Sequence, residues 1–212
     1  MKLRDQAYDS FTENLLSRRI LPGQFTTQRE LSALTGMPLG AIRELIPRLE
    51  ADGLLKTVPQ RGMQITHIDL DLVRNAFQLR LILEAEAAAE FALTATEDER
   101  AEIEKNHQDI LDEAAISITD DLVERAQNVD WAFHDTLIDH LNNRIISDIY
   151  RVNSIKIRLI RQELTRIQPE IVISVIGDHM KIIEALNTRD PEKAKLALCE
   201  HLENSRNRAL QI

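Results

Sequence analysis

Helix-breaking residues almost disappear from this chain after residue 68. Residues 69–212 contain one glycine, Gly177, and two prolines, Pro169 and Pro191. Because glycine and proline interrupt helices most strongly, a segment this poor in both is expected to form long helices. We predict six, over 69–94, 97–116, 119–141, 143–167, 169–188 and 191–211, packed as an antiparallel bundle.

Capping residues mark the expected starts of several helices. Thr96 with Glu99, and Thr27 with Glu30, have the spacing of a capping box, in which each side chain satisfies the other residue's backbone N–H. Pro191 follows Asp190 and occupies a position that proline favours in a first helical turn.

Residues 1–68 show a more interrupted pattern. We expect helices over 3–19, from about 27 to 36, and over 38–52, separated by "LPGQ", Gly36 and Gly53. Two β-runs, "LLKTV" and "MQITH", follow and are joined by the turn-like "PQRG". Three short helices and a hairpin predict a winged helix-turn-helix, whose third helix enters the major groove of DNA. The alternative is a small helical cap on a larger protein.

Charge divides the chain at the same place. Residues 1–68 hold 9 Lys/Arg and 7 Asp/Glu, a net charge of +2, whereas the remainder carries −11. The fold expected is therefore mainly α with two domains, 1–68 for DNA binding and 69–212 as a helical bundle. Cys199 is the sole cysteine, and no secretory signal or 18-residue apolar window is present, which suits a cytoplasmic protein without a membrane role.

The first 68 residues resemble the GntR family of bacterial transcriptional regulators. The stretches that carry the resemblance are "PGQFTTQRELSALTG", "AIRELIPRLEADGLL" and "PQRGMQIT". The resemblance implies binding of double-stranded operator DNA, with contacts from Arg29, Arg43, Arg61 and Gly62. Arginine can fork onto a guanine edge or a phosphate, and a glycine at the wing tip allows close backbone approach.

The sequence departs from this family in the third helix. The family usually has a polar and basic run where this chain has "MPLGAI", and Leu39 stands where an arginine is often found. Base readout is therefore expected to differ. Pro47 also falls inside the helix, where it removes a backbone hydrogen bond at a cost of about 3 kcal/mol or forces a kink.

Polar residues interrupt the apolar stripes of the later helices. A carboxylate and three imidazoles are expected to face the bundle interior, together with an arginine and an amide: Asp130, His134, His179, His201, Arg80 and Asn153. One buried histidine is more often a core residue than a ligand. Three with an aspartate can be satisfied by a divalent cation, but spacing alone leaves the metal and core interpretations equally open.

The same region resembles the FCD subgroup of GntR regulators. The matching stretches are "DWAFHDTLIDHLNN", "DHMKIIEALNTRDPEKA" and "HLENS". The resemblance implies an all-helical effector-binding and dimerisation domain that holds a metal through Asp130, His134, His179 and His201. Zinc suits such ligands, and nickel is the alternative. Six helices resemble the VanR-type branch more than the FadR-type branch.

The function expected is that of a homodimeric repressor controlled by a small organic carboxylate at the metal site. Arg80 is expected to pair with an effector carboxylate and Asn153 to bond a hydroxyl. Two alternatives stay open: a metal-dependent enzyme on a small carboxylate, with Glu84 as candidate base, and a regulator with a purely structural metal. His67, His107 and His140 are interpreted as surface or structural, and Cys199 as buried and inert.

Overall fold

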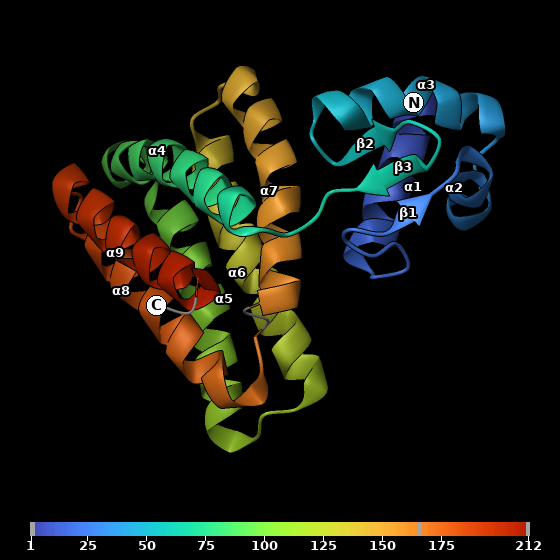
Figure 1. Ribbon diagram of the computed structural model, residues 1–212. Coiled ribbons are helices and arrows are strands. Elements are labelled where there is room, and N and C mark those ends of the chain that lie inside the picture. The colour runs from blue at the N-terminus through green and yellow to red at the C-terminus, as the bar shows by residue number, and fades with distance from the viewer. Residues whose placement is uncertain (1–2, 165–166, 211–212) are drawn as a thin grey trace. The chain divides into compact units, whose positions relative to one another are not determined.

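The computed structural model describes residues 3–164 and 167–210, and Figure 1 shows it as a chain of helices with one small sheet. The chain divides into two compact units. One comprises Met1–Val73 with Ser154–Ile160, and the other Arg74–Asn153 with Arg161–Ile212. The predicted mainly α fold is confirmed. Within the described ranges, no helix is both long and apolar enough to cross a membrane.

The part of the first unit before residue 68 forms, in the described residues, three helices and a three-stranded antiparallel sheet. The helices are α1 (Leu3–Leu16), α2 (Gln28–Thr35) and α3 (Leu39–Ala51), and the strands are β1 (Phe25–Thr26), β2 (Leu55–Val58) and β3 (Gly62–Ile65). The strand order is β1-β3-β2, and β2 and β3 form the predicted hairpin with Thr57 opposite Met63. This arrangement is the winged helix-turn-helix that the pattern indicates. The short strand β1, which pairs Thr26 with Met63, was not predicted.

The helix ends of this unit follow their capping residues. Thr27 caps α2, its side chain accepts from Glu30 N–H, and the Glu30 carboxylate accepts from Thr27 N–H at 2.7 Å. Gly36 ends α2 in the left-handed conformation at φ 68°. The core under these helices is apolar and buried, and it includes Phe11, Leu15, Ile42, Leu45 and Met63.

Pro47 lies inside α3, which continues through it from Leu39 to Ala51. Its ring is exposed, while Leu45 and Leu49 on the opposite face are buried. The carbonyl of Arg43, which loses its helical N–H partner to the proline, belongs to an exposed residue and can be hydrated. Water can bond the Arg43 carbonyl in place of the missing N–H, and the apolar face of the helix remains buried. These two features explain why α3 tolerates the proline.

Gly62 begins β3 at φ +90°, a conformation that L side chains rarely adopt. A Cβ at this position would lie 2.8 Å from the carbonyl oxygen of Thr26. The glycine is therefore required by the packing of β3 against β1, inside the protein. Approach of a DNA backbone is not needed to explain it.

The second unit is built from long helices that match the six predicted segments. They are α4 (Leu70–Thr94), α5 (Glu97–Ile116), α6 (Asp120–His140), α7 (Arg144–Leu164), α8 (Val172–Asn187) and α9 (Pro191–Leu210), with a 3₁₀ turn, η1 (Pro169–Ile171), before α8. The capping box of Thr96 with Glu99 is present, and Pro191 opens α9. The predicted helix end at 167 is wrong, because α7 is helical to Leu164 and Ile167 is described but not helical. Residues 165–166 and the predicted end at 211 lie outside the described residues.

Apolar side chains from these helices form the bundle core. The larger cluster includes Phe91 of α4, Phe133 and Leu137 of α6, Ile183 of α8 and Leu198 of α9. A second cluster joins α5, α6 and α8 through residues such as Ile110, Leu122 and Ile176. Polar residues lie between the helices beside this core, and they form the site described next.

Candidate metal centre

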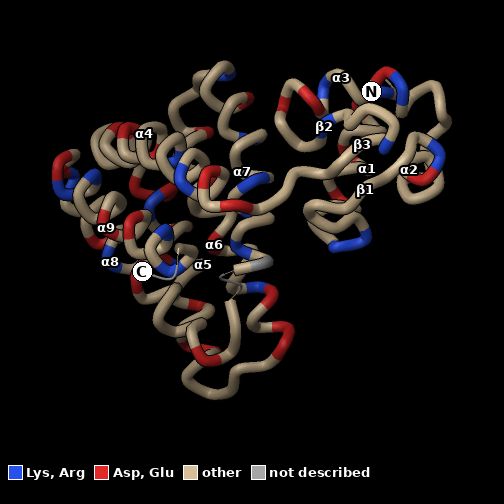
Figure 2. Tube along the Cα trace, viewed as in Figure 1, with Lys and Arg blue, Asp and Glu red and all other residues tan. Residues whose placement is uncertain are grey.

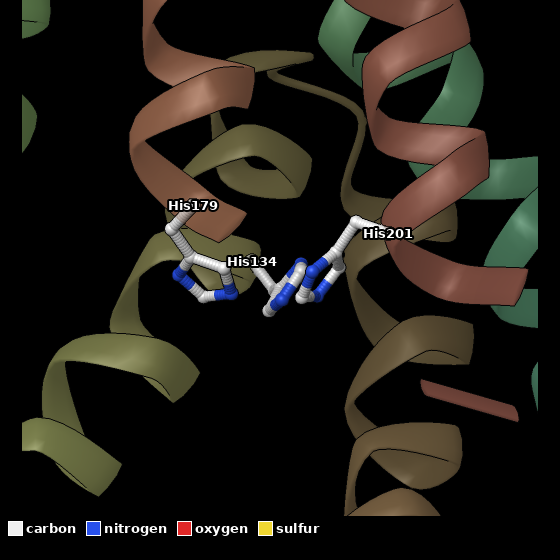
Figure 3. A group of neighbouring side chains, drawn as sticks. All are labelled: His134, His179 and His201. Carbon is white, nitrogen blue, oxygen red and sulfur yellow. The ribbon is translucent and has the colours of Figure 1, made fainter. Parts of the chain in front are cut away.

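Three histidines from three helices meet inside the bundle. His134 of α6, His179 of α8 and His201 of α9 each offer a ligand atom within 4.8 Å of the others (Figure 3). Their exposed fractions are 2%, 0% and 4%, so none reaches bulk solvent. The interrupted apolar stripes of these helices therefore do converge on one interior point.

Burial favours the neutral form of the His134 and His201 rings. Desolvation, helped by the nearby Arg80 guanidinium, lowers the pKa of His134 to about 4, although Glu84 opposes the shift. Desolvation and the neighbouring His179 and His134 hold the pKa of His201 well below its usual range. A neutral imidazole keeps one ring nitrogen with a free lone pair, which is the form that binds a metal.

Several of these nitrogens are buried without a hydrogen-bond partner. Among the described residues, this is true of both ring nitrogens of His201 and of Nε2 of His134. Buried polar atoms are normally paired, and imidazole is a preferred ligand of zinc and related divalent metals. The donor set and its unsatisfied nitrogens therefore fit a divalent transition metal.

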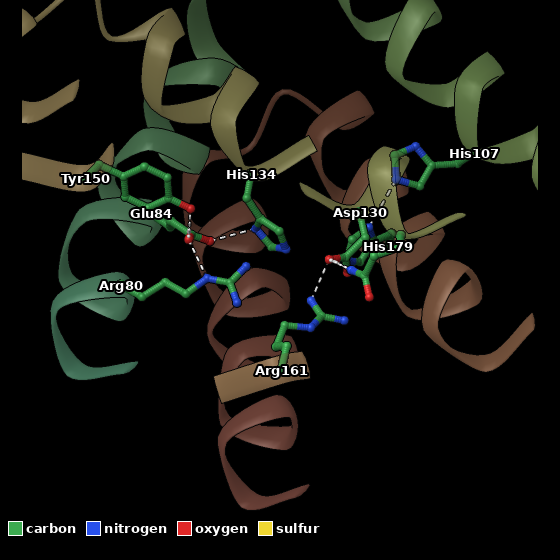
Figure 4. A network of polar contacts seen from close by, with 9 residues as sticks. Arg80, Glu84, His107, Asp130, His134, Tyr150, Arg161 and His179 are labelled. Atoms are coloured by element: carbon green, nitrogen blue, oxygen red, sulfur yellow. Dashed lines mark hydrogen bonds and ion pairs between the residues drawn. The ribbon is translucent and has the colours of Figure 1, made fainter. Parts of the chain in front are cut away.

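Asp130 lies on the His179 side of this trio. Its Oδ1 is 3.3 Å from Nε2 of His179, and its Oδ2 is 2.5 Å from Nη1 of Arg161 on α7 (Figure 4). Burial alone would raise the pKa of this carboxyl, but Arg161 and His179 hold it well below its usual range. Asp130 is thus an ionised, fully buried carboxylate with one oxygen bound to an arginine and the other facing a histidine.

A second buried carboxylate, Glu84 of α4, contacts His134 and two further side chains. Its Oε1 accepts from Arg80 Nε at 2.5 Å and from the Tyr150 hydroxyl at 2.6 Å, and its Oε2 lies 2.7 Å from His134 Nδ1 (Figure 4). Burial raises the pKa of Glu84, but Arg80 and His134 outweigh it and lower the value to about 2. Glu84 therefore holds both Arg80 and His134 in place.

Arg80 and Asn153, the residues predicted to bind an effector, have different surroundings. Arg80 is 2% exposed, and its Nη1 is buried without a hydrogen-bond partner in the described part of the chain. Asn153 of α7 donates its side-chain amide to the Ala76 carbonyl at 2.9 Å. That bond joins α7 to α4, so the amide already has a structural task.

Sequence reasoning missed three residues of this network: His107, Tyr150 and Arg161. His107 of α5 was interpreted as a surface or structural residue, but it is 1% exposed and its Nε2 lies 3.1 Å from His179 Nδ1. It interrupts the buried stripe that contains Ile103 and Ile110, which is the signal that identified the other histidines. The criterion of a polar residue inside an apolar stripe, applied to α5, identifies His107 as an inward-facing residue.

The remaining singled-out residues are not part of the histidine cluster. His67 is exposed, and His140 is half-buried against Phe91, with its Nε2 2.8 Å from the Thr94 hydroxyl. Cys199 is half-buried rather than buried, and desolvation raises the pKa of its thiol. A raised thiol pKa agrees with the interpretation of this cysteine as unreactive.

The arginines predicted to contact DNA are all exposed. Arg29 lies in the first turn of α2, and Arg43 on α3 donates through Nε to Gln28 Oε1 at 3.2 Å. Arg61, beside Gly62 in the hairpin turn, places its guanidinium 5.4 Å from the centroid of the Phe25 ring. Figure 2 shows that lysine and arginine are interspersed with acidic residues along the chain, so these few side chains have to provide any local positive surface.

Comparison with known proteins gives a consistent set of matches. Residues 75–204 match the FCD domain family. The chain is 24% identical over 211 residues to the HTH-type transcriptional repressor RspR of Escherichia coli, covering 99% of this chain and 90% of that protein. It is 24% identical over 206 residues to the transcriptional regulator YdhC of Bacillus subtilis, covering 94% and 90%. The structure of E. coli McbR/YncC superposes with a TM-score of 0.80 at 19% identity, over 100% of this chain and 98% of that one.

Proposed function

This chain belongs to the FCD-domain family of GntR-type transcriptional regulators, and we propose that it is a repressor controlled by a small organic carboxylate at a buried metal centre. The observation that carries the proposal is the group of His134, His179 and His201, in which several buried nitrogens have no hydrogen-bond partner among the described residues. A histidine cluster of this kind inside a regulatory bundle provides a place where ligand binding can alter helix packing.

The three histidines and Asp130 are the residues that would hold the metal. His134, His179 and His201 supply ring nitrogens, which burial keeps neutral in His134 and His201, and Asp130 supplies a carboxylate whose charge is already balanced by Arg161. Zinc is the metal that these ligands suit best, with nickel as the alternative. When bound, the metal supplies a positive centre at which a carboxylate oxygen can be held.

Arg80 supports the choice of a carboxylate as the effector. Its Nε is held by Glu84, while its Nη1 is buried and unpaired in the described part of the chain. A positioned guanidinium binds a carboxylate through charge-assisted hydrogen bonds. Asn153 can assist with a hydroxyl of the effector through its carbonyl oxygen or its second N–H, while one N–H stays bound to the Ala76 carbonyl.

The enzyme alternative loses support at Glu84, the candidate general base. A base that removes a proton near neutral pH needs a pKa close to the working pH. Glu84 has a pKa of about 2 and is engaged by Arg80, Tyr150 and His134. These contacts suit a residue that holds its neighbours in position.

For DNA binding we propose contacts through Arg29, Arg43, Arg61 and the hairpin turn at Gly62. The first three are exposed, on the helices and hairpin of a winged helix-turn-helix. In such a protein, a homodimer presents two recognition helices to half-sites about one helical turn apart. Coupling between effector and operator is then reciprocal, so each ligand changes affinity for the other by the same factor.

Operator binding can be tested with duplex DNA from the promoter nearest the protein's own gene. Wild-type protein should retard this DNA in a gel-shift assay, and Arg43→Ala should abolish the shift because it removes a predicted base or phosphate contact. Arg74→Ala, an exposed arginine outside the three helices and the sheet, is the matched control and should bind as wild type. Absence of a wild-type shift on every nearby promoter would contradict the proposal.

A further inference from the structure

His107 lies directly behind one of the proposed metal ligands. Its Nε2 is 3.1 Å from Nδ1 of His179, and its Nδ1 is 2.8 Å from the carbonyl oxygen of Ile103 one turn earlier on α5 (Figure 4). Phe133 packs edge-on against the His107 ring and also contacts the His179 ring, with centroids 5.3 and 4.8 Å away. Both imidazoles are therefore held in fixed orientations inside the bundle.

These two hydrogen bonds determine which nitrogens carry hydrogen. A carbonyl oxygen can only accept, so Nδ1 of His107 must be the donor to Ile103. The Nε2 of a neutral His107 ring then has only a lone pair, so it accepts from His179, and the hydrogen of that bond belongs to His179 Nδ1. It follows that a neutral His179 presents its free lone pair at Nε2.

The Nε2 atom of His179 faces Asp130 Oδ1 at a distance of 3.3 Å. In this tautomer two acceptors face each other in a fully buried place, and such a pair is favourable only when a cation lies near both. The hydrogen-bond chain from Ile103 through His107 therefore prepares His179 to bind a cation. Without His107, His179 could carry its hydrogen on Nε2 and donate it to Asp130 instead.

We propose that His107 is a positioning residue of the metal centre, which fixes the tautomer and ring orientation of His179. The proposal rests on the metal centre proposed above and assigns a task to α5, which contributes none of the four proposed ligands. Glu84 stands in the corresponding place behind His134, 2.7 Å from its Nδ1. Loss of such an outer partner commonly weakens metal binding by roughly 10- to 100-fold.

Zinc affinity measured against a competing chelator provides the first test. His107→Leu removes the acceptor at similar volume and should weaken zinc binding by about 10- to 100-fold, whereas His107→Gln, whose amide oxygen can accept, should stay within about threefold of wild type. His140→Leu, on the same helix as His134 but bonded to Thr94, is the matched control and should not change affinity. Wild-type affinity in His107→Leu, or an equal loss in His107→Gln, would overturn the proposal.

The tautomer of His179 is a second readout that does not depend on bound metal. In metal-free wild type with ¹⁵N-labelled histidines, ring-nitrogen NMR shifts should show hydrogen on Nδ1 of His179, with the signal assigned by its loss in His179→Gln. Hydrogen on Nε2 alone, with none on Nδ1, would contradict the role of His107, even if His107→Leu fails to fold. Failure of wild type to bind zinc would contradict the proposed metal centre itself. Normal zinc binding by wild type, with the same zinc affinity in His107→Leu, would contradict only the role of His107.

Discussion

At the residue scale, the bundle interior is organised as two buried carboxylates that each hold an arginine and a histidine. Glu84 contacts Arg80 and His134, and Asp130 contacts Arg161 and His179. Each carboxylate is fully buried, so the paired guanidinium offsets the cost of placing its charge there. Removing one member leaves the other charge uncompensated.

Glu84→Gln should therefore destabilise the bundle strongly. The substitution keeps the side-chain shape but leaves the buried Arg80 charge without its carboxylate, an effect that costs about 3 kcal/mol or more of unfolding free energy. Glu86→Gln, which alters an exposed carboxylate on the same helix, should cost less than about 0.5 kcal/mol. Urea unfolding of metal-stripped protein measures both. Equal stabilities for the two variants would show that the Arg80 charge is compensated elsewhere.

Gly62→Ala tests the interpretation that this glycine is fixed by internal packing. The new Cβ would meet the Thr26 carbonyl oxygen at 2.8 Å, at a backbone φ of +90°. Strain of this kind costs about 1–3 kcal/mol, so the unfolding free energy should fall by that amount. Gly40→Ala is the control, because its Cβ would meet nothing within 4 Å in a helix, and it should be neutral or stabilising. Unchanged stability of Gly62→Ala would contradict the role of internal packing.

Sequence reasoning identified the three histidines that cluster in the bundle but not their partners. An interrupted stripe shows that His134, His179 and His201 face inward, because helical periodicity fixes direction. It does not show which side chains on other helices they meet, so the contacts of Arg161 with Asp130 and of Tyr150 with Glu84 could not be predicted. His107 was within reach of the same method and was missed.

At the scale of elements, helices were predictable where residues with specific local roles mark their ends. Thr27 and Thr96 form the predicted capping boxes, and α5 spans Glu97–Ile116, as the pattern indicates. Strand β1 could not be predicted, because two residues offer no periodicity and its pairing with β3 depends on a distant segment. The turn η1 was expected as part of one helix, although Pro169 at its start cannot donate a backbone hydrogen bond.

Pro47→Ala should stabilise α3. Alanine restores the N–H that can bond the Arg43 carbonyl, and its position is exposed, so no core packing is lost. Part of the roughly 3 kcal/mol helix penalty of proline should be recovered, giving a gain of about 1 kcal/mol or more in unfolding free energy. Thermal and urea unfolding check the gain. A loss of stability would mean that the proline ring makes a favourable contact that its exposure does not reveal.

At the scale of the whole molecule, the chain joins a weakly basic winged helix-turn-helix to an acidic bundle. The net charges of +2 over residues 1–68 and −11 over the rest make the bundle a poor surface for DNA. DNA affinity therefore has to come from a few positioned arginines, and it should fall as salt rises. Regulation, in the function proposed above, depends on what the buried histidines bind.

Titration of zinc into metal-stripped protein, with heat and bound metal recorded, tests the buried metal centre most directly. Wild type should bind about one zinc ion per chain, as expected for a single site of histidine and carboxylate ligands. The double variant His179→Ala, His201→Ala should bind none while keeping its helical circular dichroism. Zinc bound by this folded double variant with the stoichiometry and affinity of wild type would contradict the assignment of these histidines as ligands.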